Sequence, residues 1–215
     1  MSELVSKPAN TTANLDQLIR DRWSPRIYDT SHTLSDAELE SLGEAFRWAP
    51  SSSNGQPWKL VIATRGSELH TQISEQGLGG FNASWAPNAA ALAIVLGEEK
   101  NSKGADRNPV DTAYDLGLAS MKLIIQAESM GLKAHVMGGI DHGGIKEILN
   151  AEGHFVMVAI SIGLQGSLEG QEEAIVTREK SPRERKSDAY LINQRFLVLR
   201  CTLALGSGAG AGICI

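Results

Sequence analysis

The side chains best suited to bind an anion stand close together near the start of the chain, as Arg22, Ser24 and Arg26. A guanidinium presents a planar fork of N–H donors that matches a phosphate or a carboxylate. Pro25 stops or redirects the helical pattern before it, which leaves the three side chains around a helix end. The pattern predicts a compact donor set for an anionic ligand. A solvated helix end with surface arginines is the alternative.

A second polar segment runs from Pro50 to Pro57 and contains three serines, Asn54 and Gln56. The prolines and Gly55 exclude a regular helix, because proline lacks an N–H and glycine is conformationally permissive. Small hydroxyl and amide groups let backbone and side chains approach a planar, polar ligand closely. An ordinary Ser/Gly/Pro connection between two elements is the alternative.

Composition limits the classes of protein to which the chain can belong. It has 215 residues, of which 42% are hydrophobic and 21% charged, as expected for one globular domain with a substantial core. Its net charge of −5 argues against a nucleic-acid surface. We expect a cytoplasmic protein with no membrane partner, because the sequence shows neither a membrane-length apolar run nor a signal-peptide core. Cys201 and Cys214 form no disulfide framework, and no Cys/His spacing suggests a metal site.

Helical and strand patterns interleave along the chain without βαβα regularity, and they must position these polar segments. Ser35 can cap a helix, and apolar residues recur at three- and four-residue spacing from residue 111 to 130, before Gly131. The nearly continuous apolar run over residues 89–97 is typical of a central strand buried on both faces. We predict helices over residues 14–22, 36–48, 66–76, 111–130 and 143–150, and strands over residues 58–64, 89–97, 133–137 and 155–162.

The remaining stretches are interpreted from their composition. The glycines of residues 77–82 predict a flexible loop, a candidate lid or channel wall, and residues 98–108 an exposed loop. Residues 171–189 are highly charged, with a basic cluster at residues 183–186, and predict a solvated face. The five histidines are scattered, and we interpret them as surface or helix-end residues. The sequence contains no repeat, no phosphate loop and no serine in a nucleophile-elbow context.

The chain resembles the nitroreductase family of FMN-dependent oxidoreductases in two strings, Arg22-x-Ser24-x-Arg26 and Pro50-Ser51-Ser52-x-Asn54-x-Gln56-Pro57-Trp58. The helix that contains Asp115-x-Gly117-x-Ala119, the string Met137-Gly138-Gly139 and the late Arg183-x-Arg185 are similar to the family in order and spacing. The resemblance spans roughly residues 14 to 190. Many members carry a carboxylate where this chain has Gly138, and some carry a lysine where it has Ser84-Trp85. These departures leave the substrate class open.

The resemblance implies an α+β fold with three layers, α/β/α, around a mostly antiparallel central sheet, in an intertwined homodimer. It divides the chain into a flexible arm of residues 1–13, an FMN-binding domain of residues 14–190 and a C-terminal extension of residues 191–215. For the extension we consider a role in wrapping the partner subunit. The apolar face expected on residues 111–130 exceeds what one domain needs to bury, which also favours a homodimer.

The implied FMN contacts come from both ends of the chain and include no catalytic side chain. Two basic clusters far apart in sequence can converge on a dianionic phosphate. Bare glycine backbone can lie flat against the ring near N5, where a side chain would block hydride entry. The residues implied are Arg22, Ser24 and Arg26 for the phosphate and pyrimidine, Pro50, Ser51, Ser52 and Asn54 as the segment supplied by the partner subunit, Asn82 in the second loop, Gly138 and Gly139 along the ring, and Arg183 and Arg185 for the phosphate.

The resemblance also implies a reaction. Members of the family transfer hydride from NADH or NADPH to FMN and then to a second substrate by a ping-pong mechanism, for which the protein mainly binds, orients and tunes the flavin. The expected acceptors are nitroaromatics, quinones or related small unsaturated molecules. FAD is disfavoured because the sequence lacks a Rossmann-type pyrophosphate loop. Two alternatives remain: a different flavin chemistry, such as dehalogenation or flavin fragmentation, and a flavin-binding protein without turnover.

Overall fold

A four-stranded antiparallel sheet with the strand order β1-β2-β4-β3 lies at the centre of the fold. The computed structural model describes residues 4–186, and contacts divide the chain into one unit of residues 1–182 and another of residues 183–215. The inner strand β2 is buried along nearly its whole length, as expected for a strand covered on both faces. The strands are β1 (Trp58–Thr64), β2 (Ala91–Glu98), β3 (Lys133–Met137) and β4 (His154–Gly163).

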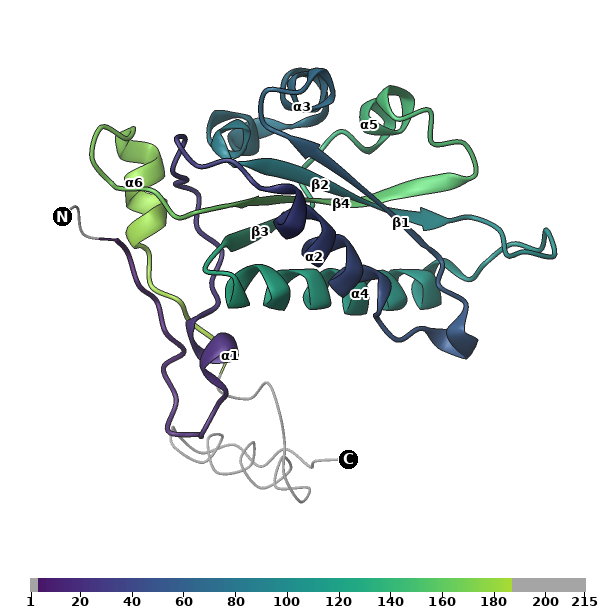
Figure 1. The fold of residues 1–215 in the computed structure, drawn as a ribbon, viewed down its shortest axis with the longest axis horizontal. Coiled ribbons are helices and arrows are strands. Elements are labelled where there is room, and N and C mark those ends of the chain that lie inside the picture. The colour runs from purple at the N-terminus through teal and green to yellow at the C-terminus, as the bar shows by residue number, and fades with distance from the viewer. Residues whose placement is uncertain (1–3, 187–215) are drawn as a thin grey trace, which may run out of the picture. The chain divides into compact units, whose positions relative to one another are not determined.

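Helices cover both faces of this sheet, so that the first unit has three layers (Figure 1). On one face lie α2 (Asp36–Arg47) and α4 (Pro109–Ser129), and on the other lie α3 (Glu68–Gln72) and α5 (His142–Ile148). The predicted α+β class with an antiparallel sheet is confirmed.

Each face of the sheet has its own hydrophobic core, which holds a helical layer in place. Fully burying a large apolar side chain contributes about 1.5–3 kcal/mol relative to leaving it exposed. The core beneath α2 and α4 includes Leu42, Phe46, Leu116 and Leu123, and the core on the opposite face includes Ile73, Trp85 and Ile145.

The ends of α2 and α4 follow from their capping residues. The Ser35 hydroxyl accepts a hydrogen bond from the Glu38 amide at 3.3 Å, and Glu38 Oε2 accepts one from the Ser35 amide at 2.7 Å, which completes a capping box. Asn108 caps α4 and Pro109 takes its first position, where a missing N–H costs nothing. Gly131, with a φ of 76°, follows the end of α4.

The charge run over residues 171–189, predicted to be a solvated face, is mostly exposed in its described part, but it contains α6 (Glu173–Lys180), which buries Ile175 and Glu179. These two residues are four positions apart and therefore lie on one side of the helix. Among the histidines, His70 is buried in the last turn of α3, and the interpretation as surface or helix-end residues is wrong for His135, which is partly buried on the strand β3.

The glycine-rich residues 77–82 are built into the layer that contains α3. Leu78 is buried and forms an isolated bridge with Ile140. Two 3-10 turns follow, at Gly80–Ser84 and Ala86–Asn88, with the fully buried Trp85 between them. Within the described part of the chain, no helix is long and apolar enough to span a membrane.

Candidate functional site

The first group of predicted cofactor residues lies on the turn after α1 (Gln17–Asp21). Arg22 ends this helix by donating its backbone N–H to the Leu18 carbonyl at 3.0 Å. Its guanidinium Nη1 donates to Ser24 Oγ at 3.3 Å. Arg26 follows two residues later, with its guanidinium carbon 6.0 Å from the ring centre of Trp85. The structure thus keeps the predicted donors on one short segment.

Two partly or fully buried side chains fix the backbone of this segment from different elements. His135 on β3 has Nδ1 2.9 Å from the Pro25 carbonyl oxygen, and its ring lies 4.6 Å from that of Trp85. Glu179 on α6 accepts a hydrogen bond from the Arg26 amide at 2.8 Å. The segment is therefore held through its main chain, by contacts from β3 and α6.

The ring of His135 adds no positive charge to this region. Burial is the main cause that lowers the pKa of His135 to about 4, and the charges of Arg26 and Arg22 act in the same direction. The hydrogen bond with Pro25 opposes this shift. At neutral pH His135 is therefore uncharged, while both guanidinium groups remain protonated. An anion is the ligand that this charge distribution favours.

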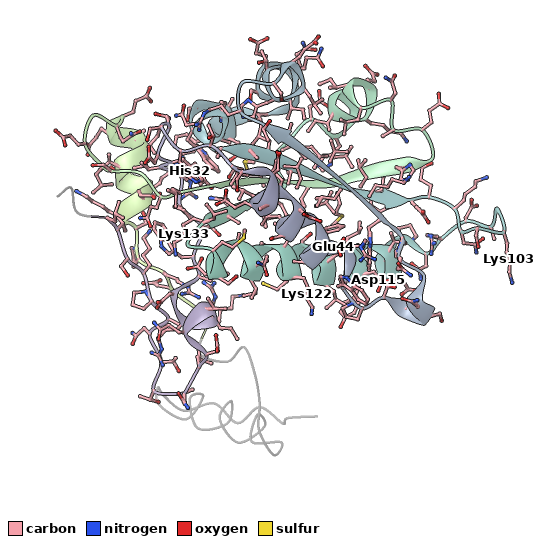
Figure 2. All side chains as sticks on the ribbon, in the orientation of Figure 1. His32, Glu44, Lys103, Asp115, Lys122 and Lys133 are labelled. Atoms are coloured by element: carbon pink, nitrogen blue, oxygen red, sulfur yellow. The ribbon has the colours of Figure 1, made fainter. Side chains whose placement is uncertain are left out.

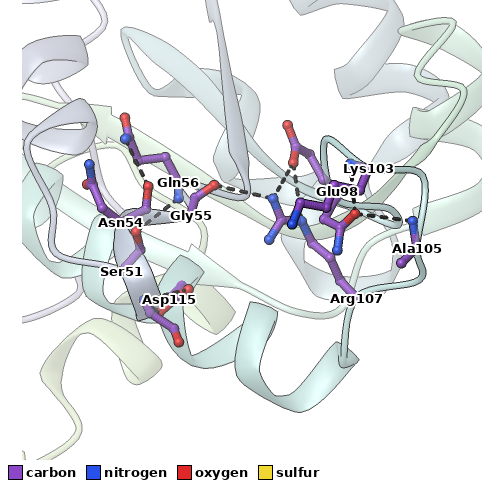
Figure 3. Close-up of polar contacts among 11 residues, drawn as sticks. Ser51, Asn54, Gly55, Gln56, Glu98, Lys103, Ala105, Arg107 and Asp115 are labelled. Atoms are coloured by element: carbon purple, nitrogen blue, oxygen red, sulfur yellow. Dashed lines mark hydrogen bonds and ion pairs between the residues drawn. The ribbon is translucent and has the colours of Figure 1, made fainter.

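The serine-rich loop is the second group, and its backbone is anchored by α4. The Ser52 amide donates to the buried Asp115 carboxylate, at 3.1 and 3.2 Å from its two oxygens. Asp115 comes from α4 (Figure 2). Ser51 Oγ accepts a hydrogen bond from the Gln56 amide at 2.9 Å (Figure 3). The Asn54 side chain is exposed. Its surface position leaves Asn54 accessible to a ligand or to a second chain.

The backbone of the loop adopts a conformation that residues other than glycine rarely take. Ser53, Asn54 and Gln56 have φ values of 51°, 55° and 43°. Arg107 supports the same loop by donating to the Gly55 carbonyl at 3.2 Å (Figure 3). Left-handed residues of this kind cost of order 1–3 kcal/mol each and tend to cluster at ligand sites. This strain favours a functional loop over an ordinary connection.

The third group joins two segments that are far apart in sequence. Asn82 Nδ2 donates to the Gly139 carbonyl at 2.9 Å. A Cβ added at Gly138 would meet nothing within 4 Å, so open space lies beside its backbone. A planar group could lie against this bare stretch. The buried Trp85 connects this group with the first, since it follows Asn82 by three residues and faces Arg26.

The predicted residues thus form separate clusters in one chain. Figure 1 shows α1 near one end of α4 and the turn Ser52–Asn54 near the other. With a rise of about 1.5 Å per residue, α4 extends about 21 Å from Asp115 to its end at Ser129. Arg183 and Arg185 belong to the second unit, and their role stays a prediction.

Sequence reasoning missed the side chains that support these loops. Asp115 and Glu179 are buried carboxylates, and each accepts a backbone N–H from a predicted cofactor segment. In the sequence, each is marked only as an acidic residue at an inward-facing position of a helix. Asp115 stands between the buried Thr112 and Leu116, and Glu179 follows the buried Ile175 by four residues. His135 lies on a predicted strand, and its contact with Pro25 connects residues that are 110 positions apart.

Comparisons with known proteins agree with the resemblance. A model described as the nitroreductase family matches residues 19–164. The oxygen-insensitive NADPH nitroreductase of Helicobacter acinonychis is 27% identical over 164 residues, which cover 76% of this chain and 77% of that protein. A solved structure described as an oxidoreductase containing FMN is 32% identical, with a TM-score of 0.77, and the match covers 87% of this chain and 95% of that one. A nitroreductase family protein from Clostridium difficile shares the fold at 18% identity, with a TM-score of 0.63 over 84% of this chain and 99% of its own.

Proposed function

The chain belongs to the nitroreductase family and is an oxidoreductase of the NAD(P)H nitroreductase type, and from this premise we propose that it binds FMN and reduces small unsaturated molecules. Hydride from NADH or NADPH would reach nitroaromatic, quinone or related acceptors through the flavin. The observation that carries the proposal is the anchoring of two polar loops by buried carboxylates. Each loop is fixed through its backbone and keeps polar side chains for a ligand.

The residues present fit FMN by the chemistry of their donors. Arg22 and Arg26 supply the charge-assisted donors that a phosphate or the polar edge of the ring would need. The open backbone at Gly138, tied through its neighbour Gly139 to Asn82, offers a flat surface without a side chain. When bound, FMN supplies the hydride chemistry, and these residues bind and orient it. His135 is uncharged at neutral pH, because the pKa of its ring is lowered to about 4, so the ring does not act as a cationic acid there.

A homodimer with shared sites is part of the proposal. Val110, Tyr114 and Met121 on α4 are exposed although they are large and apolar. Beside them, a cavity of about 590 Å³ between α2 and α4 is lined by residues that include Trp48 and Pro50. A second copy would cover this apolar face, and it would bring the serine-rich loop to the arginines of its partner.

Anaerobic spectroscopy tests the function directly. We expect purified protein to show flavin absorption bands corresponding to about one non-covalent FMN per chain, as one phosphate-binding cluster per chain implies. The flavin should bleach on titration with NADH or NADPH, and a quinone or nitroaromatic should restore the colour. Protein that shows no flavin bands after incubation with excess FMN would overturn the proposal. Bound flavin that neither nucleotide reduces would instead indicate a binding protein without this turnover.

A further inference from the structure

Glu179 is a buried carboxylate in direct contact with the segment that carries Arg26. Its side chain is 1% exposed, and its Oε2 accepts the Arg26 amide hydrogen at 2.8 Å. Burying a carboxylate costs several kcal/mol unless hydrogen bonds and opposite charges compensate for it. An apolar side chain on this face of α6 would fill the space without that cost. The carboxylate therefore calls for an explanation beyond packing.

The charges that surround Glu179 come from three parts of the first unit. Three cations interact with Glu179 or with its partner Arg26: Lys7 in the N-terminal arm, Arg26 itself and Arg178 on α6. The neighbouring titratable hydroxyl is that of Tyr28. Burial raises the pKa of Glu179, while the Arg26 amide and the charge of Lys7 lower it. Arg26 in turn has its pKa lowered by burial and raised by Glu179.

Glu179 and Arg26 therefore interact through both the backbone and their charges. The hydrogen bond to the amide fixes where the Arg26 main chain lies, and hence the origin of its side chain. The carboxylate also offsets part of the positive charge that Arg26 would present to a ligand. An effective dielectric constant near 20 lets such a pair of charges act over several ångströms in a partly buried site.

Reduced FMN carries a negative charge on its ring at neutral pH, and a guanidinium beside the ring would stabilise that charge. We propose that Glu179 is a positioning residue of the flavin site, which holds Arg26 in place and weakens the preference that Arg26 would give the site for the reduced, anionic flavin. The inference rests on the proposed binding of FMN near Arg26. Without the negative charge of Glu179, the site would favour the reduced cofactor more strongly. The carboxylate would thus keep the reduced flavin ready to pass its electrons to the acceptor.

The test compares Glu179→Gln, which keeps the size and one acceptor oxygen but removes the charge, with Glu173→Gln on the exposed part of the same helix. For each protein, the FMN dissociation constant is measured by flavin fluorescence and the midpoint potential by equilibration with reference dyes. In Glu179→Gln we expect the midpoint potential of the bound flavin to rise. The rise should correspond to a roughly 3- to 10-fold increase in the affinity for reduced FMN relative to oxidised FMN. Glu173→Gln should keep the wild-type potential.

The outcomes separate this inference from the proposed function. Wild-type protein that binds no FMN contradicts both. Wild-type protein that binds FMN, with an unchanged potential in Glu179→Gln, overturns only the role of Glu179 and leaves a purely structural anchor. If Glu179→Gln does not fold, the same comparison is made with Glu179→Met, which removes the same charge and fills the space with an apolar side chain of similar size. The potential should again rise, and an unchanged value would contradict the proposal.

Discussion

Two buried carboxylates anchor the backbone of the two predicted cofactor segments in the same way. Asp115 accepts the Ser52 amide, and Glu179 accepts the Arg26 amide. A charged acceptor makes a stronger hydrogen bond than a neutral one, particularly where water is excluded. A loop anchored through its main chain can present its side chains outward without losing its shape. Preorganisation of this kind lowers the entropic cost of binding a ligand.

His135 makes the stability of the fold depend on pH. Its pKa of about 4 in the folded protein lies below the value of about 6.5 expected for an unfolded chain. The unfolded state therefore takes up a proton as the pH falls from about 6.5 to 4, while the folded state does not. We expect His135 alone to reduce the free energy of unfolding by about 1–2 kcal/mol between pH 7 and pH 5.

Urea denaturation of wild type and His135→Gln at several pH values measures this contribution. The variant should be less stable at pH 7, where it loses the contacts with Pro25 and Trp85, but its stability should fall less between pH 7 and pH 5. Other titrating groups, such as Glu179, contribute to both proteins, so the difference between the two slopes isolates His135. Equal slopes in the two proteins would contradict the assignment.

At the scale of elements, the sequence predicted those helices and strands whose burial shows in the spacing of nearby apolar residues. The apolar run over residues 89–97 and the three-to-four spacing of residues 111–130 correspond to β2 and α4, because burial on both faces or on one stripe leaves a clear period. The helix α6 escaped prediction, since only Ile175 and Glu179 face inward among many charges. The two carboxylate anchors of the site connect residues that are 63 and 153 positions apart, which no local pattern reveals.

The turn Ser52–Asn54 depends on α4 for its strained conformation, so loss of Asp115 should damage the cofactor site more than the fold. Replacement by alanine leaves the Ser52 amide without its charged acceptor, at a cost of about 1.5–3 kcal/mol. Part of that cost should appear as weaker FMN binding, about 10-fold or more. The measurement is the FMN dissociation constant together with the thermal unfolding midpoint.

A matched control is available one turn earlier on the same helix. Asp111 is exposed in the first turn of α4, so Asp111→Ala removes the same charge without touching the loop. It should change stability only by the small helix-dipole contribution of about 0.3–1 kcal/mol. Asp115→Ala that binds FMN as tightly as Asp111→Ala would show that the anchor is dispensable for the site.

At the scale of the whole molecule, the distribution of the clusters favours the proposed homodimer. The segment with Arg22 and the turn with Asn54 lie near different ends of α4 (Figure 1). The exposed apolar residues of α4 lie along the helix between those ends and include Val110, Tyr114 and Met121. A twofold mate that covers them would run its own α4 beside this one. In an antiparallel arrangement, the Asn54 turn of one chain would then meet the Arg22 segment of the other.

Subunit complementation tests this arrangement. Arg22→Ala and Asn54→Ala should each weaken FMN binding when present in both chains, because every site then lacks one contact. In a mixed dimer of the two variants, one site carries both substitutions and the other carries neither. Random association of equal amounts makes half of the dimers mixed, so about one quarter of all sites should recover wild-type affinity. Co-expression followed by FMN titration and sedimentation would measure the recovered fraction and the size of the active species. A mixture that binds FMN no better than either variant alone, or an active species that sediments as a monomer, would contradict the shared site.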